Sequence, residues 1–170
     1  MTPTDLVLTP MGLRFRGHHF ACSIGRGGVS HTKREGDGAT PCGVHRIVGG
    51  YYRADRLACP AAWLSPIGPR DLWSDDPTSA AYNSHVRGPY AGSHEQLRRA
   101  DRLYDLILVT DWNWPRAIPG KGSAIFLHRW RKPGHPTEGC IAFEASDLLW
   151  ITQRIQPGCR LIVQPRSGQS

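Results

Sequence analysis

A histidine and a cysteine twelve positions apart are the residues of this sequence best suited to chemistry. His128 ends a short apolar run, and Cys140 opens another after a segment rich in turn formers. Cysteine attacks as its thiolate, so it needs a nearby base and access to a substrate. Two short strands joined by a turn would bring the two side chains together. The pattern predicts acyl transfer, with Cys140 as nucleophile and His128 as base.

The residue before the cysteine is a glycine, which lets the backbone approach a substrate closely. Converging N–H groups of Gly139 and Cys140 would stabilise an oxyanion by about 3 kcal/mol per donor. Two other interpretations stay open on these residues alone. One is a buried structural cysteine, and the other is a metal site of His128, His135 and Cys140, which lacks an evident fourth ligand. We expect neither a metal nor a cofactor.

Length and composition predict one mainly β domain over residues 1–170. The chain has 170 residues, enough for a sizeable core, and its 19 Gly and 14 Pro disfavour a helix bundle. Its net charge of +7 suits an anionic partner. The basic residues are scattered and form no tail or helical stripe, so we do not expect a nucleic-acid binder.

The five cysteines include no C-x-x-C pair, which argues against zinc ribbons and thioredoxin-like redox motifs. Cys42 and Cys59 lie beside prolines and are expected to be core residues or a disulfide in an oxidising compartment. Residues 1–13 lack the basic start and apolar core of a secretion signal. No apolar run is long enough to span a bilayer, so no membrane insertion is expected.

Short apolar stretches divided by Gly and Pro predict the strands of the first half. Residues 5–24 predict two strands with a turn at Arg16-Gly17. Residues 25–43 are too rich in glycine and polar residues for regular structure, and an exposed loop is expected there. Residues 44–52 resume a strand pattern.

The segment from 53 to 92 carries five prolines and several aromatic residues. Such a segment is not expected to pair regularly into a sheet. Residues 60–92 are therefore predicted to form a long loop that acts as a lid or substrate wall. Its aromatic side chains are equally compatible with fastening the segment to the core.

Ser93, with Gln96 three residues later, resembles a capping box and predicts a helix to about Arg102. The remaining elements follow from apolar runs and helical spacing. They are strands at 104–111, 123–128 and 160–164, a helix at 145–156, and a frayed tail at 165–170.

Two segments of the sequence resemble the YkuD-type L,D-transpeptidases. F-L-H-R-W-R-K-P-G-H-P-T-E-G-C-I, at 126–141, is similar to the active-site signature of that family. E-G-D-G-A-T-P-C-G-V-H-R-I, at 35–47, resembles its second hallmark, a Gly-rich turn followed by T-P-x-G. The resemblance implies a YkuD-like β-sandwich with one or two peripheral helices. It also implies peptidoglycan stem peptides as partners and a place in the periplasm or cell envelope.

The resemblance assigns a role to each residue of the signature. Cys140 matches the nucleophile and His128 its base, while the backbone carbonyl of Arg129 matches the group that orients the imidazole. Gly139 and Cys140 match the oxyanion hole, and Thr137 the small hydroxyl residue. The implied reaction is transpeptidation, in which a thioester on Cys140 is resolved by a diaminopimelate amine of a neighbouring stem.

The chain departs from the family pattern next to the nucleophile. Glu138 stands where most relatives carry His, and Ala142 where many carry Arg or Asn. A carboxylate beside Cys140 would favour a substrate amine over a carboxylate, and it would raise the thiol pKa. The T-E-G-C variant is similar to a proteobacterial branch of which some members form 1,3 rather than 3,3 cross-links.

Tyr82, Asn83 and His94 are expected to contact substrate, with packing as the alternative. Two other functions remain open. One is a thiol L,D-carboxypeptidase or amidase that releases the acyl group to water, and the other is a non-catalytic cell-wall-binding module. A monomer is expected.

Overall fold

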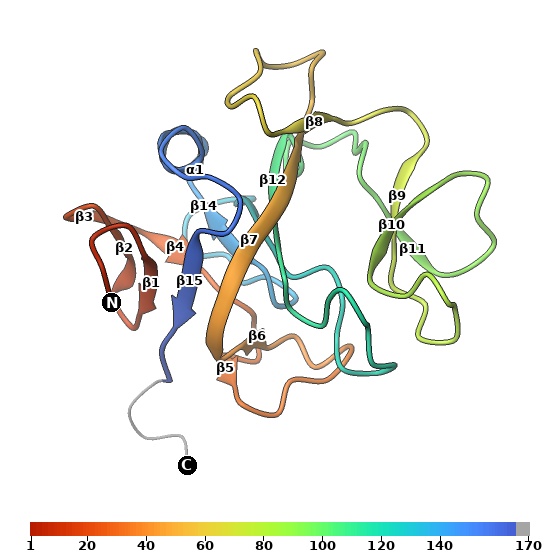
Figure 1. The fold of residues 1–170 in the computed structure, drawn as a ribbon, viewed down its shortest axis with the longest axis horizontal. Helices are drawn as coiled ribbons and strands as arrows, with labels where there is room; N and C mark the ends of the chain where they lie inside the picture. Colours follow the sequence, from red (N-terminus) through yellow and green to blue (C-terminus); the bar gives the residue numbers. More distant parts are fainter. Residues whose placement is uncertain (166–170) are drawn as a thin grey trace.

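The computed structural model describes residues 1–165, and most of its strands belong to one sheet of ten. The strands of this sheet are β1 (Leu6–Thr9), β2 (Gly12–Phe15), β3 (His18–Phe20), β4 (Cys22–Ser23), β7 (Gly43–Tyr52), β8 (Ser65–Pro66), β12 (Leu106–Thr110), β13 (Phe126–Arg129), β14 (Ile141–Phe143) and β15 (Arg160–Val163). Their order is β3-β2-β1-β15-β7-β12-β13-β14-β4, with β8 paired to β7. The long strand β7 crosses the middle of the molecule (Figure 1). The prediction of a mainly β fold is confirmed.

Both faces of the main sheet are covered, which gives the fold its layers. In β12, Leu106 and Leu108 pack into one apolar cluster, and Ile107 and Val109 pack into a second on the opposite face. Helix α1 (Ala145–Thr152) contributes to the first cluster. A strand buried on both faces needs a continuous apolar run, which explains the sequence of β12.

A smaller sheet of three strands covers the other face, where the sequence predicted an irregular lid. It consists of β9 (Asp71–Ser74) flanked by β10 (Ser84–Arg87) and β11 (His94–Gln96), and it stands apart from the main sheet in Figure 1. Trp73 of β9 packs edge-on against Phe126 of β13 at 5.0 Å between ring centroids. The prediction that this segment cannot pair into a sheet is wrong, because its prolines fall outside β9, β10 and β11.

The helix predicted from Ser93 to Arg102 is also wrong. Its first residues form β11, in which His94, Glu95 and Gln96 pair with β9. Leu97 then enters the second apolar cluster with none of its surface exposed. Pairing with a neighbouring strand and burial of Leu97 override the local capping signal, which is worth only about 1 kcal/mol.

Several other predictions hold with shifted ends. The hairpin turn at Arg16-Gly17 is confirmed, and the two residues have φ of 49° and 78°, as a tight hairpin turn requires. The predicted helix at 145–156 ends four residues early, at Thr152. The expectation of an exposed, irregular loop at 25–43 is wrong in part, because two short strands pair there, β5 (Val29–Ser30) and β6 (Thr40–Pro41), and Ala39 and Thr40 are buried.

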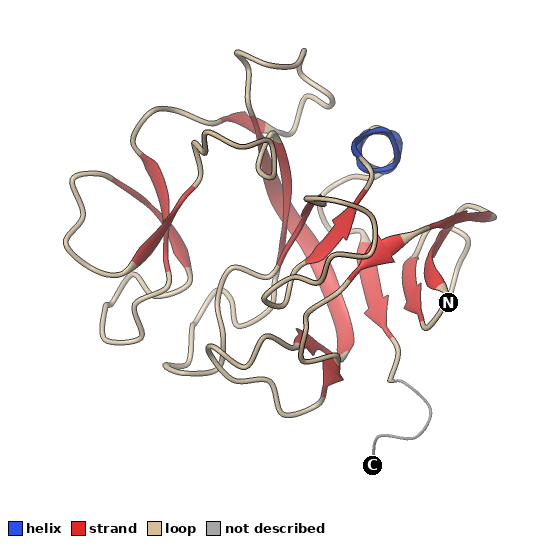
Figure 2. Cartoon of the chain, turned by 180° about the vertical axis from the view of Figure 1, so that it is seen from behind, coloured by secondary structure: helices blue, strands red, loops and turns tan. Residues whose placement is uncertain are grey.

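The five cysteines are free thiols in this structure, so Cys42 and Cys59 do not form the disulfide that the sequence left open. The predicted frayed tail begins at Pro165, and its remaining residues, 166–170, lie outside the described part of the chain. Figure 2 shows how much of the chain between the sheets consists of loops. Among the described residues, no helix is long and apolar enough to cross a membrane.

Candidate active site

Neighbouring parallel strands position His128 and Cys140. The register of β13 and β14 places Leu127 opposite Ile141 and His128 opposite Ala142. Cys140, one residue before β14, therefore falls opposite Phe126 on the same face as His128. Both side chains line the same cavity. The sequence prediction that two short strands bring this pair together agrees with the register.

The thiol of Cys140 is held by backbone groups of its neighbouring segment. Sγ donates to the carbonyl oxygen of Ala124 at 3.1 Å, and the Phe126 N–H approaches Sγ at 3.4 Å. Ala124 has a φ of 52°, a left-handed conformation that is uncommon for a residue other than glycine. Such backbone strain persists only where surrounding contacts fix it.

The imidazole of His128 is oriented through one ring nitrogen. Nδ1 lies 2.6 Å from the carbonyl oxygen of Arg129. Because a carbonyl can only accept, Nδ1 carries the proton and Nε2 has a free lone pair. The ring is 7% exposed and packs edge-on against Tyr104 at 5.4 Å between centroids. Nε2 is therefore the nitrogen available to take up a proton.

Burial keeps both groups uncharged. It raises the pKa of the Cys140 thiol to about 12, with a further contribution from the negative charge of Glu95. Burial also lowers the pKa of His128 to about 4. At neutral pH the pair is thiol and neutral imidazole, not a preformed ion pair. An attack by this thiol on a carbonyl would require its proton to move at the same time, which is general-base chemistry.

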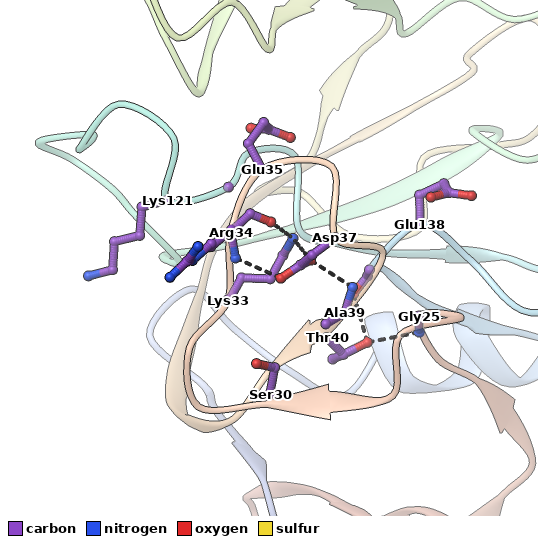
Figure 3. Close-up of polar contacts among 12 residues, drawn as sticks. Gly25, Ser30, Lys33, Arg34, Glu35, Asp37, Ala39, Thr40, Lys121 and Glu138 are labelled. Carbon is purple, nitrogen blue, oxygen red and sulfur yellow. Dashed lines mark hydrogen bonds and ion pairs between the residues drawn. The ribbon is translucent and has the colours of Figure 1, made fainter.

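The turn before Cys140 requires glycine. Gly139 has a φ of +135°, and a Cβ built there would lie 2.8 Å from the carbonyl oxygen of Ala39. Thr40, with none of its surface exposed, donates its hydroxyl to the Gly139 carbonyl at 2.8 Å and accepts from the Gly25 N–H at 2.9 Å. Figure 3 shows the latter contact. The T-P-C-G turn thus supports the backbone beside the thiol.

Thr137 braces the same turn from within. Its hydroxyl donates to the Cys140 carbonyl at 2.6 Å and accepts from the Gly139 N–H at 3.1 Å. Its own backbone pairs with Ile24 and Arg26. The Gly139 amide is therefore engaged within the protein, and it can serve an oxyanion only by leaving the threonine hydroxyl.

Glu138 does not offer an uncompensated charge to the thiol. Its carboxylate is paired with the Arg26 guanidinium at 2.9 Å, and its side chain is 76% exposed. The carboxylate that raises the pKa of Cys140 belongs to Glu95. The expectation that Glu138 raises this pKa is wrong, because its side chain turns outward to Arg26.

Cys140 and His128 open into a cavity of about 540 Å³. It lies between the main sheet, the three-stranded sheet and two loops, one with residues 33–36 and the other with residues 135–138. Its walls include charged residues of both signs, which are Lys33, Glu35, Asp75, Glu95, Arg99, Arg131 and Glu138. This volume accommodates a peptide segment. Ala142, the second departure from the family pattern, also lines it.

Two of the residues expected to contact substrate are instead buried in the protein. Asn83 is 4% exposed, and its side-chain amide makes four hydrogen bonds. In one of them, Asn83 Oδ1 accepts from the Ala124 N–H at 3.0 Å, and the carbonyl of this same Ala124 accepts from the Cys140 thiol. Tyr82 donates to Glu35 and accepts from the Gly122 N–H. These contacts favour a positioning role for both residues.

His94 lies on β11, and its Nδ1 is 2.7 Å from the carbonyl oxygen of Gly92. Like Tyr82 and Asn83, it does not line the cavity. Arg129 contributes its carbonyl to His128, as described above, and its side chain does not line the cavity either. Of the nine predicted site residues, the cavity wall contains Cys140, His128, Thr137 and Glu138.

Sequence reasoning missed one side of the cavity, which carries Asp75, Glu95 and Tyr104 and is called the acidic wall below. Glu95 accepts the Tyr104 hydroxyl at 2.5 Å, and Tyr104 in turn packs on His128. Glu95 fell within the wrongly predicted helix, and Tyr104 was assigned only to a buried strand. Lys33, beside the recognised T-P-C-G turn, is buried and paired with Asp37. A tyrosine at the start of an apolar strand, directly after a polar loop, is the one signal that pointed toward this wall.

Residues 10–163 match the family model of the YkuD L,D-transpeptidase catalytic domain. The comparisons with curated proteins and with solved structures gave no match. The matched range includes the T-P-C-G turn, both strands of the His128 and Cys140 pair, and nearly all of the fold described above. It confirms the family that the two sequence segments indicated.

Proposed function

The chain belongs to the YkuD family of L,D-transpeptidase catalytic domains, and we propose that it joins peptidoglycan stem peptides through a thioester on Cys140. The observation that carries this proposal is the shared cavity of Cys140 and His128, with the imidazole already in the tautomer that a base requires. The match over 10–163 further supports a single catalytic domain for residues 1–170.

In the first half-reaction, Cys140 Sγ attacks the carbonyl carbon at an L-centre of a donor stem. His128 Nε2 takes the thiol proton as the sulfur–carbon bond forms. The carbon–nitrogen bond to the following D-residue then breaks, and His128 returns the proton to the departing amine. The thioester and a free amine are the products.

The second half-reaction reverses these roles for a different amine. A side-chain amine of diaminopimelate on a neighbouring stem attacks the thioester carbon, and His128 accepts its proton. The carbon–sulfur bond breaks, and the sulfur regains a proton from His128. The Arg129 carbonyl holds the imidazole in one orientation through both steps.

The amides of Gly139 and Cys140 are the proposed oxyanion donors. The Gly139 N–H would exchange the Thr137 hydroxyl for the substrate oxygen. Each such donor contributes about 3 kcal/mol to transition-state stabilisation. Thr137 and Glu138, both at the cavity wall, are the proposed contacts for the donor stem.

The proposed partner places the protein in the periplasm or cell envelope, where stem peptides are found. We propose 1,3 rather than 3,3 cross-links, from the T-E-G-C variant of the signature. The net charge of +7 suits a carboxylate-rich polymer.

The test incubates purified disaccharide-tetrapeptide with wild-type protein and with Cys140→Ala, followed by mass spectrometry. We expect dimers from the wild type and none from the variant, and the fragmentation pattern assigns the cross-link as 1,3 or 3,3. Undiminished dimer formation by Cys140→Ala would exclude the mechanism. Shortened monomers without dimers would instead identify an L,D-carboxypeptidase, and binding without any product would identify a cell-wall-binding module.

A further inference from the structure

The cavity beside Cys140 contains acidic side chains without basic partners. Glu35, Asp75 and Glu95 all line it, and within residues 1–165 none of them has a Lys, Arg or His nitrogen within 4 Å. Glu35 and Glu95 accept only tyrosine hydroxyls, from Tyr82 and Tyr104. Glu35 and Glu95 therefore have a hydrogen bond each but no counter-charge in contact.

Two of the three Lys and Arg residues that line the cavity, Lys33 and Arg99, are already paired elsewhere, and Arg131 has no ion pair among the described residues. Lys33 Nζ is 2.6 Å from Asp37, and the Arg99 guanidinium is 2.6 Å from Asp101. In Figure 3 the Glu35 side chain points away from the Lys33 and Asp37 pair. Glu35, Asp75 and Glu95 thus line the cavity without an ion-pair partner within residues 1–165.

Asp75 gives independent support for a missing partner. Its Oδ1 atom is enclosed, yet it has no hydrogen-bond partner among the described residues. A buried polar atom left unpaired is costly, and in native structures it commonly marks the place of a bound group. Asp75 follows β9 directly, and β11 carries Glu95 beside that strand, so the three-stranded sheet places both carboxylates on the same wall.

The electrostatics of Glu95 indicate how close these charges are. Burial and the negative charges of Asp75 and Glu35 raise the pKa of Glu95, while Arg99 and the Tyr104 hydrogen bond lower it in part. The charge of Glu95 is in turn felt at the Cys140 thiol. A cation entering this space would relieve the repulsion and would lie close to the reacting sulfur.

We propose that Glu95, with Asp75, forms the binding site for the protonated amine of the acceptor stem, which loses one proton to solvent before the neutral amine attacks the thioester. This inference rests on the proposed function, and it names residues that select the second substrate. Glu138, the carboxylate that the sequence suggested for this task, is neutralised by Arg26 and exposed. Glu95 is held in place by the Tyr104 hydroxyl and keeps its second oxygen for the ligand.

The experiment separates the two half-reactions in Glu95→Gln. Glutamine keeps an oxygen that can accept the Tyr104 hydroxyl but removes the charge. Formation of the Cys140 thioester from disaccharide-tetrapeptide is measured by intact mass, and its consumption is measured against two nucleophiles. One is the diaminopimelate amine of an added disaccharide-tetrapeptide, which is cationic, and the other is hydroxylamine, which is largely uncharged at neutral pH.

We expect thioester formation and hydroxylamine consumption to stay within about twofold of wild type in Glu95→Gln. Consumption by the stem amine should fall about tenfold to a hundredfold, the range for one hydrogen bond to a charged group. Asp75→Asn should show the same selective loss to a smaller extent. Asp147→Asn, on α1 and outside the cavity, removes the same charge and serves as the matched control.

Two outcomes would overturn the assignment. The first is a Glu95→Gln variant whose reaction with the stem amine is unchanged. The second is an equal loss of thioester formation in Glu95→Gln and Tyr104→Phe, which would show that Glu95 acts on His128 through Tyr104. Failure of the wild type to form any thioester would instead count against the proposed function, so the two failures are distinguishable.

Discussion

The two walls of the cavity differ in how they are built. The strand wall, formed by β13, β14 and the turn before Cys140, comes from one continuous segment and carries Cys140 and His128, the proposed nucleophile and base. The acidic wall, formed by β9, β11 and Tyr104, comes from strands paired across long loops and carries Glu95 and Asp75. The first wall is suited to acylation of the enzyme, and the second to selection of the amine.

In the proposed reaction, the donor stem and the acceptor amine would therefore be bound by separate parts of one fold. On the strand wall, backbone groups fix the reacting side chains, as with the Arg129 carbonyl on His128. On the acidic wall, the Tyr104 hydroxyl holds the carboxylate of Glu95. Changes on the strand wall should therefore impair both half-reactions, and changes on the acidic wall only the second.

Replacing the base should give the largest effect. His128→Gln removes the free Nε2 lone pair, and thioester formation should slow by about 10² to 10⁴-fold, the usual contribution of a general base. The rate is measured by intact mass after mixing with disaccharide-tetrapeptide. His31→Gln, on an exposed loop, is the matched control. A decrease confined to the amine step would break the division between the two walls.

Asn83 tests how the acidic wall is attached to the strand wall. Asn83→Ala removes four hydrogen bonds, three of them buried, and it leaves the Trp73 indole N–H and the Ala124 N–H without their acceptor. The free energy of unfolding should fall by about 3 kcal/mol, measured by urea denaturation. Gln96→Ala, an exposed amide on β11, should change stability by less than about 0.5 kcal/mol. Equal values for the two variants would show that Asn83 does not join the walls.

Thr40 tests the support of the strand wall. Thr40→Val keeps the shape of the side chain, but it leaves the Gly25 N–H and the Gly139 carbonyl unpaired. We expect a loss of about 2 kcal/mol in unfolding free energy, together with slower thioester formation, because the turn before Cys140 loses its anchor. If Thr40→Val were destabilised but formed the thioester at the wild-type rate, the turn before Cys140 would not contribute to acylation.

The pH dependence of thioester formation tests whether burial keeps His128 neutral. His128 has a pKa of about 4, so the neutral base persists to lower pH than an ordinary histidine would allow. Thioester formation should change by less than about twofold between pH 6 and pH 8, and decline only toward pH 4. A histidine with a pKa near 6.5 would give about a fourfold rise over the same range. That steeper profile would contradict a buried, neutral His128.

The smallest effect is expected at the rim. Glu138→Gln removes an exposed ion pair with Arg26, and such pairs contribute about 0 to 1 kcal/mol. The change in unfolding free energy should be below about 0.5 kcal/mol and should disappear at high salt. A larger and salt-independent loss would show that the pair fixes the turn before Cys140.

The strand wall could be predicted from the sequence, whereas the acidic wall could not. The apolar run of β12, the hairpin at Arg16-Gly17 and the His128 and Cys140 pair depend on local pattern, and each was predicted. The three-stranded sheet was missed because β9 gains its partners from residues ten or more positions away. Glu95 could not be recognised, since only the pairing of β11 with β9 turns it toward the cavity.

The sequence also did not show which charged side chains form ion pairs. The position of Glu138 beside Cys140 suggested a direct effect on the thiol, yet Arg26, more than one hundred residues away in the chain, neutralises it. Lys33 and Arg99 are likewise paired with acids outside the cavity. Side-chain direction decides these contacts, and it follows from tertiary structure.

The most direct test of the account is to locate the acyl group. Wild-type protein is mixed with disaccharide-tetrapeptide, quenched in acid within the first turnover, digested and analysed by tandem mass spectrometry. The account predicts the donor acyl mass on the peptide that contains Cys140, with accumulation slowed in His128→Gln. An acyl group on another residue, or cross-linked dimers formed without any acylated Cys140, would contradict it.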